Sequence, residues 1–268
     1  MQIKKLFKTA TLALVLLLSA CSGLPDAKDE TKNWSAEKLY SEAMDELKNG
    51  GYDKSILLFE KLESRFPFGV YAQQAQMEIA YAHYRAEEQP EAIAAVERFI
   101  KLHPNHPNVD YLYYLRGLIN FNDKIGLFDF IAGQDRTERD PKAAREAFDS
   151  FKLLVDRYPN SKYTPDAIER MKYLVNTMAQ YEVHVSEYYY RRGGYVAAVN
   201  RAQTVIKQFP GAPANEDALY LMVLCYDKMG LPDLHKDAER VFLATYPNSP
   251  LLTGGRVKPK TWWKFWQS

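Results

Sequence analysis

The side chains best suited to chemistry in this 268-residue chain are two cysteines and five histidines. Histidine carries protons and binds metals near neutral pH. No histidine here belongs to the His-Glu-x-x-His pattern, and His103 and His106 share a proline-broken loop without a neighbouring carboxylate. A glycine-rich phosphate loop and a Gly-x-Ser-x-Gly elbow are also missing from the sequence. We therefore expect no enzyme, no metal site and no cofactor, unless the fold brings distant residues together.

Cys21 lies in the one pattern that predicts a definite covalent chemistry. It closes Leu18-Ser19-Ala20-Cys21, after a lysine-rich start and an uncharged run that is too short to span a bilayer. This ending is similar to the lipobox of bacterial lipoproteins, whereas the alternative is a buried cysteine after an ordinary signal peptide. The similarity implies cleavage before Cys21, a diacylglycerol thioether on its sulfur and an N-palmitoyl chain on its amine. Several acyl chains, at ~0.8 kcal/mol per buried CH2, make such an anchor effectively permanent.

Composition limits the partners of the mature chain. Three of the 35 Lys and Arg residues lie in residues 1–20, so 32 basic residues remain against 34 acidic ones. A near-neutral chain lacks the concentrated basic face that nucleic acid requires, and we expect no nucleic-acid partner. If Cys21 is acylated, Cys225 has no disulfide partner, and its apolar surroundings predict a small core residue.

The chain repeats itself, and the repeat predicts the fold. Five helix-like segments end in an aromatic residue or His followed by proline, and the intervals between the prolines are 37, 55, 51 and 37 residues. The shorter interval is typical of a two-helix repeat of the tetratricopeptide (TPR) type, and the longer ones indicate inserted residues. We predict an all-α, TPR-like helical-repeat solenoid: five helix pairs in a right-handed superhelix. The prolines are Pro67, Pro104, Pro159, Pro210 and Pro247.

Small residues recur at fixed distances before these prolines, where the two helices of a TPR pair cross closely. His235 and Val223 break this pattern in the fifth unit, which predicts different packing there or an offset of one residue. The residues twelve positions before each proline are Ser55, Ala92, Ala147, Ala198 and His235, and those twenty-four before are Ala43, Ala80, Ser186 and Val223.

The third and fourth units carry phrases that resemble the BamD family of lipoproteins, also called competence lipoprotein ComL. These phrases are Arg116-Gly117-Leu118, Asp135 to Pro141, Ala147-Phe148 and Arg192 to Ala197. The resemblance implies a non-enzymatic scaffold on the periplasmic face of the bacterial outer membrane. It further implies that one half binds unfolded outer-membrane proteins through their C-terminal strand. The other half would dock the periplasmic domains of BamA and the other Bam lipoproteins.

These expectations divide the chain into successive segments. The substrate-binding half holds the first two repeats, and the partner-docking half holds the other three. Asp135 to Asp140 alternates in charge and is predicted to be an internal brace for an insertion in the second half. The segments are a signal peptide at 1–20, a flexible tether at 21–33, repeats 1–2 at 34–105, repeats 3–5 at 106–250 with the insertion at about 121–139, and a tail at 251–268.

The first helix of each TPR pair faces the concave surface, and its residues are candidates for peptide binding. Methionine adapts its shape and tyrosine offers a flat face with a hydroxyl, while arginine can bind a terminal carboxylate. The alternative is that this stripe is ordinary core between helices. In the second half, Arg192 and Arg201 are candidates for partner docking, or else they form local pairs on a solvated helix face. The peptide-binding candidates are Tyr40, Met44, Leu47, Met77, Tyr81, Tyr84 and Arg85.

The tail belongs to no pattern of the family. Trp262, Trp263 and Trp266 alternate with lysines there. This composition suits a membrane interface, but a docking peptide for a partner or a disordered tail fits equally well. Two other functions also stay open: a TPR lipoprotein that adapts peptidoglycan enzymes or proteases, and a cell-wall hydrolase, which the missing acid–base motif disfavours.

Overall fold

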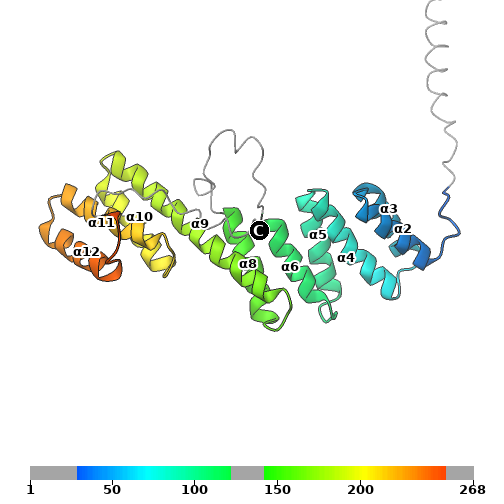
Figure 1. Ribbon diagram of the computed structural model, residues 1–268. Coiled ribbons are helices and arrows are strands. Elements are labelled where there is room, and N and C mark those ends of the chain that lie inside the picture. The colour runs from blue at the N-terminus through cyan, green and yellow to red at the C-terminus, as the bar shows by residue number, and fades with distance from the viewer. Residues whose placement is uncertain (1–28, 122–141, 252–268) are drawn as a thin grey trace, which may run out of the picture.

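The computed structural model describes residues 29–121 and 142–251, and all regular structure within these ranges is helical (Figure 1). The prediction of an all-α helical-repeat fold is confirmed. The signal peptide with Cys21, the insertion with Asp135 to Asp140 and the tail from residue 252 lie outside the described residues. The helices are α2 (Ala36–Lys48), α3 (Tyr52–Arg65), α4 (Val70–Arg85), α5 (Gln89–Leu102), α6 (Val109–Asn120), α8 (Lys142–Arg157), α9 (Thr164–Arg191), α10 (Tyr195–Gln208), α11 (Asn215–Lys228) and α12 (Pro232–Thr245).

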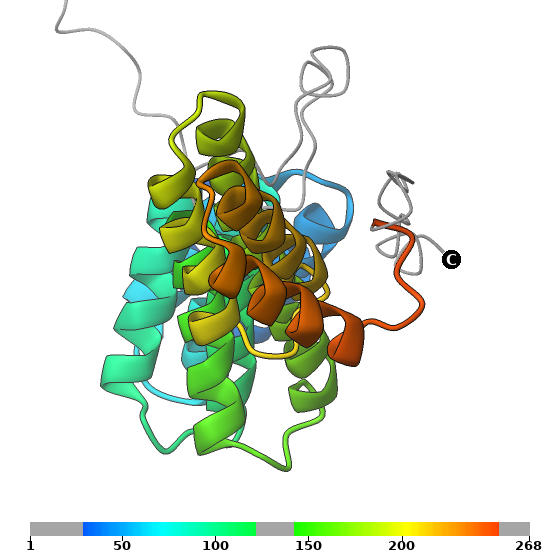
Figure 2. The same ribbon diagram turned by 90° about the vertical axis from the view of Figure 1, so that its left-hand side faces the viewer.

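The helices form five consecutive pairs that stack in a row from α2 and α3 to α11 and α12, and each helix packs mainly on its neighbours in the chain. Figure 2 shows the same row turned by a quarter. The core is accordingly divided into several clusters along the row instead of one centre. Four of the five second helices each bury one phenylalanine completely: Phe59, Phe99, Phe151 and Phe242. Each pair therefore depends on its neighbours to keep its apolar face from water.

The two helices of a pair cross at the small residues that the repeat predicts. The hydroxyl of Ser55 donates to the carbonyl oxygen of Ala43 at 2.8 Å, and that of Ser186 donates to the carbonyl oxygen of Ala198 at 2.8 Å. All four residues are fully buried. In the fifth pair, Nδ1 of His235 donates to the carbonyl oxygen of Val223 at 3.1 Å. The fifth unit therefore crosses at the predicted positions, without an offset, and an imidazole replaces the small side chain.

The third pair crosses at Gly117, which lies one 37-residue interval after Ala80. A Cβ atom added to Gly117 would lie 2.3 Å from Cε1 of Phe151, so only glycine fits against this ring. The fourth pair differs in length, because α9 has 28 residues while the other described helices have 12 to 16. This extension of α9 accounts for the 51-residue proline interval.

Residues at the end of the predicted tether contact the first repeat. Asp29 binds the ammonium of Lys61 at 2.8 Å and the guanidinium of Arg65, both on α3. Hydrogen bonds from Lys61 and, to a smaller extent, from Thr31 hold the pKa of its carboxyl well below the usual value. Thr31 is buried beside them. Asp29 and Thr31, in the last part of the predicted tether, therefore have partners on the first repeat, while the flexibility of the tether stays a prediction.

We predict that Gly117→Ala destabilises the protein, although alanine favours helix more than glycine does. The new methyl group would overpack the contact with Phe151, at a cost of about 1–3 kcal/mol. Urea unfolding followed by circular dichroism measures the change, and the double variant Gly117→Ala/Phe151→Leu should recover part of the loss. Equal stability of Gly117→Ala and the parent would contradict this packing.

Candidate polypeptide-binding surface

Arg85, the last residue of α4, contacts the rings of two tyrosines. Its Nη1 donates a hydrogen bond to the phenol oxygen of Tyr81 at 2.9 Å, and its guanidinium lies 5.7 Å from the centre of that ring. It also lies 5.6 Å from the ring of Tyr52, the first residue of α3. Tyr84 contacts Tyr81, with ring centres 6.3 Å apart. The predicted residues Tyr81, Tyr84 and Arg85 therefore form one cluster.

Tyr40 continues this aromatic surface on α2. Its ring lies 5.6 Å from Phe59 and 5.5 Å from Tyr71, at the start of α4. Met44 lies one turn further along α2 and is half-buried against the same apolar cluster. Tyr40 and Met44 thus lie at the boundary between core and surface, where a bound chain could contact them.

Two predicted residues do not reach the surface. Leu47 is 6% exposed and Met77 is 7% exposed, and both belong to apolar clusters between helices. On the first helix of each pair, the apolar stripe is wider than the strip that the neighbouring helices leave exposed. The side chains of Leu47 and Met77 therefore face those helices. For Leu47 and Met77 the alternative of ordinary core is correct.

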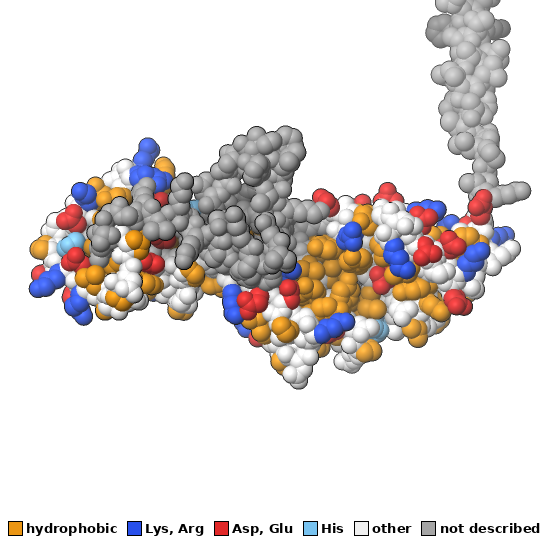
Figure 3. Space-filling view, viewed as in Figure 1, with side chains coloured by type: hydrophobic (Ala, Val, Ile, Leu, Met, Phe, Trp, Pro, Cys, Tyr) orange, Lys and Arg blue, Asp and Glu red, His pale blue; other side chains and the backbone are white. Residues whose placement is uncertain are grey.

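The third unit adds tyrosines that the sequence reasoning missed. Tyr111 on α6 packs against the same cluster as Tyr81 and Tyr84 and contacts Tyr163, with ring centres 5.7 Å apart. Tyr114 stacks on Tyr163 at 4.8 Å, with an angle of 15° between the rings. The repeat interval could have identified Tyr114, because this residue lies 37 positions after the candidate Met77. Figure 3 shows hydrophobic side chains gathered over α4 to α6.

Glu78 is the acidic group among these rings. It is half-buried on α4 and no hydrogen bond or ion pair engages it among the described residues. Burial raises the pKa of its carboxyl, and its charge in turn helps to raise the pKa of Tyr40 and Tyr111.

We call this surface the tyrosine face; it consists of Tyr40, Met44, Tyr71, Glu78, Tyr81, Tyr84, Arg85 and Tyr111. Flat rings, hydroxyls and one charge of each sign suit an extended polypeptide.

The histidines have structural partners. Nε2 of His103 lies 3.0 Å from the amide oxygen of Gln76, and Nδ1 of His83 lies 2.7 Å from the carboxylate of Glu88. His103 and His106 both contact the ring of Phe99. Across the ranges that the structure describes, no group of three or more His, Cys, Asp or Glu residues could hold a metal ion.

Cys225 is the second cysteine of the chain. The thiol is fully buried in an apolar cluster, as predicted, and burial raises its pKa to about 11. It is therefore a poor nucleophile at neutral pH. None of the described helices combines the length and the apolar character that crossing a membrane demands.

The two candidate arginines of the second half lie on the surface but are not brought together. Arg201 on α10 donates to the carboxylate of Glu182 on α9 at 3.1 Å, with its side chain 45% exposed. Arg192 follows α9 and lies over the ring of Tyr188 at 5.6 Å. Both have the local partners that the alternative predicted, and both remain accessible to another protein.

Asp217, in the first turn of α11, is the most perturbed carboxylate of the second half. Burial raises its pKa to about 6, and repulsion from Glu187 and Glu216 adds to this, while His184 and a hydrogen bond with Gln180 oppose it. We call Glu187, Glu216 and Asp217 the acidic cluster. Because the folded state disfavours the ionised form of Asp217, this carboxylate destabilises the fold at neutral pH.

The chain matches the protein family described as outer membrane lipoprotein (YfiO) over residues 32–250. A relative from Neisseria meningitidis serogroup A, named outer membrane protein assembly factor BamD, is 44% identical over 98% of this chain and 99% of its own length. A relative of the same name from Xylella fastidiosa is 35% identical over 95% of this chain and 85% of its own length. Among solved structures, the MamA protein has a TM-score of 0.37 at 15% identity and covers 84% of this chain and 98% of its own.

We predict that the free energy of unfolding falls as the pH rises from about 4 to about 6, in part because of Asp217. Between these values the folded state binds a proton that the unfolded state has released, so folding is favoured at the lower pH. Asp217→Asn should remove this part of the slope and stabilise the protein by about 1–3 kcal/mol at pH 7.5. Urea unfolding at several pH values measures this, with the exposed Asp149→Asn as control. Identical slopes for Asp217→Asn and the parent would contradict the assignment.

Proposed function

Since the chain belongs to the family of outer membrane lipoproteins that includes BamD, we propose that it is a scaffold subunit of the machinery that assembles β-barrel proteins in the bacterial outer membrane. Its role is to bind unfolded outer-membrane proteins and to dock the periplasmic domains of BamA and the other Bam lipoproteins. It performs no catalysis. The observation that carries the proposal is the tyrosine face, a surface suited to holding another polypeptide.

The tyrosine face supports substrate binding through the chemistry of its residues. The C-terminal strand of a β-barrel protein presents aromatic side chains on alternate positions and ends in a carboxylate. Rings such as those of Tyr81 and Tyr84 can pack against these aromatic groups. Arg85 already donates to a phenol and can offer its remaining N–H groups to the carboxylate.

An acylated Cys21 would limit how far from the membrane the folded repeats begin. In the proposal Cys21 bears the acyl chains, and Asp29 is the first residue held on the folded repeats. A chain spans at most about 3.3–3.6 Å per residue, so residues 21–28 reach no more than about 29 Å. The point at which the folded repeats begin, Asp29, therefore stays within that distance of the periplasmic face of the outer membrane, where an unfolded barrel must be delivered.

In the proposal, the second half of the row docks the partner proteins, and Arg192 and Arg201 are its candidate contact residues. An arginine that is held by one carboxylate keeps further N–H donors for another. Arg201 is accessible and oriented by Glu182, so less side-chain freedom is lost when a partner carboxylate binds.

We predict that Tyr81→Ala and Tyr84→Ala each weaken the binding of a peptide from the C-terminal strand of a barrel protein by about 3–10-fold, or roughly 1 kcal/mol. Fluorescence anisotropy of the labelled peptide measures the affinity. Tyr188→Ala, an exposed tyrosine of the second half, is the matched control. Unchanged affinity in both variants, with the helical spectrum intact, would exclude the tyrosine face as the binding site.

Arg85 gives a second test that is independent of aromatic packing. Arg85→Gln should weaken the peptide with a free C-terminus several-fold, and it should not affect the same peptide with an amidated C-terminus. An equal loss for both peptides would mean that Arg85 supports the rings of Tyr52 and Tyr81 and does not bind the carboxylate.

We predict that Arg201→Ala lowers the amount of BamA that co-purifies with the acylated protein from solubilised membranes by several-fold. Arg240→Ala on α12 is the control, since this arginine is also exposed and paired locally. The same recovery of BamA with Arg201→Ala and the parent would place docking elsewhere. Recovery of a wall enzyme in place of BamA would favour the adaptor function.

A further inference from the structure

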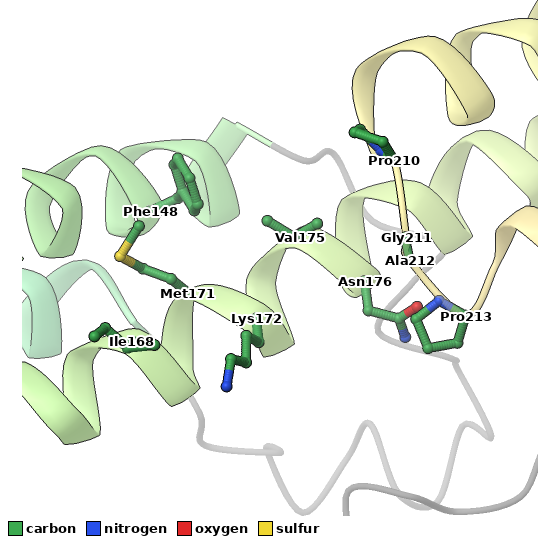
Figure 4. Close-up of a pocket in the computed structure, with 10 residues that line it drawn as sticks. All are labelled: Phe148, Ile168, Met171, Lys172, Val175, Asn176, Pro210, Gly211, Ala212 and Pro213. Atoms are coloured by element: carbon green, nitrogen blue, oxygen red, sulfur yellow. The ribbon is translucent and has the colours of Figure 1, made fainter.

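An apolar cavity of about 490 Å³ lies between α8, α9 and the loop that leads into α11 (Figure 4). Phe148 comes from α8, Met171 and Val175 come from α9, and residues 210–213 form the opposite wall. We call it the α9 cavity. Its lining is mostly hydrophobic, as in sites that take an apolar group.

One polar group in this lining has no partner. Asn176 is 7% exposed, and among the described residues its Oδ1 finds no hydrogen bond. Figure 4 shows its amide pointing from α9 toward Pro213. A buried acceptor without a donor is costly, so the cavity favours a ligand that brings one N–H. An apolar body with a single N–H donor is the description of the tryptophan indole ring.

The tail that follows the described residues is rich in tryptophan. Apart from Trp34, at the other end of the row, the tryptophans of the chain are Trp262, Trp263 and Trp266. The described chain ends at Leu251, which packs in one apolar cluster with residues of α11. The charges of Glu216 and Asp217, in the first turn of α11, influence Tyr246. The described chain therefore ends beside α11, and α11 itself begins two residues beyond the cavity wall at Pro213.

The length of the tail is sufficient. Residues 252–262 can extend to about 36 Å at 3.3 Å per residue. The whole of α11, with 14 residues, is only about 21 Å long. An indole at position 262 or later can therefore reach the α9 cavity without strain in the chain.

Charge also favours this placement. The tail carries Arg256, Lys258, Lys260 and Lys264 and has no acidic residue. The acidic cluster lies at the start of α11, beside the point where the tail leaves. Basic residues that pass over this cluster would relieve its repulsion, in the stretch of tail that precedes the tryptophans.

We propose that the tail at 252–268 folds back on its own chain and inserts one of its indole rings into the α9 cavity, where the indole N–H donates to Asn176. The basic residues before it lie along the acidic cluster. The occupant is a segment of this protein, so the inference does not depend on the proposed function.

Cross-linking tests this placement directly. The full chain carries three substitutions: Cys21→Ser, Lys172→Cys at the cavity and Thr261→Cys in the tail. This variant is treated with a short bis-maleimide, and the remaining native cysteine, Cys225, is buried. Leu57→Cys on α3 replaces Lys172→Cys in the control, because this position is exposed and at the other end of the row. We expect an intramolecular product to form at least about tenfold faster with Lys172→Cys. Equal rates for the two pairs, or a product that is mainly dimer, would overturn the proposal.

The hydrogen bond and the membrane alternative need a second measurement. In the background Trp34→Phe, the emission of the tail tryptophans should be blue-shifted in buffer because one indole is buried. Asn176→Leu should shift the emission to the red. Replacing the inserted tryptophan with phenylalanine should do the same, because only the exposed indoles then emit. Vesicles of phosphatidylethanolamine and phosphatidylglycerol test the alternative. If the emission is unchanged by Asn176→Leu and shifts only when vesicles are added, the proposal is overturned in favour of a membrane contact.

Discussion

The close crossing of the two helices in each pair is the constraint on which the rest of the structure depends. At the crossing, backbone approaches backbone, so the side chain there must be small or must bind the opposite carbonyl group. Ser55 and Ser186 do both, Gly117 makes room for the ring of Phe151, and His235 extends its ring to the carbonyl of Val223. Each pair is thereby a rigid unit whose apolar faces are covered only by its neighbours. The row of helices follows from this repetition.

The crossing also determines which residues are left for binding. Once a first helix has buried one face against its partner and another against the next pair, a narrow strip remains at the boundary with solvent. On α2, α4 and α6 this strip carries Tyr40, Tyr81 and Tyr111, which are partly buried against the apolar clusters between the helices. A polypeptide that binds there meets a preformed surface, so little conformational entropy of the scaffold is lost on binding. Such a surface suits holding another chain better than transforming it.

Much of the fold could be predicted from the sequence because the crossing leaves a periodic trace: small residues at fixed distances from a proline. The site could be predicted only in part. Met77 shares the stripe of Tyr81 on α4 and Leu47 lies on the corresponding stripe of α2, but both are buried. Periodicity shows which face a residue lies on and not how much of that face is covered. Tyr111 and Tyr114 were missed because the longer proline interval hid the register of the third unit. The α9 cavity and the unpartnered Asn176 left no signal, since the sequence does not reveal voids between distant segments.

A photo-crosslinking amino acid at position 84, on the tyrosine face, tests the scaffold role most directly. In cells that secrete a β-barrel protein, the scaffold role predicts adducts between position 84 and the unfolded barrel. It predicts none from position 57, which is exposed on α3 away from that face. Equal labelling at both positions, or labelling of the barrel at neither position, would contradict it.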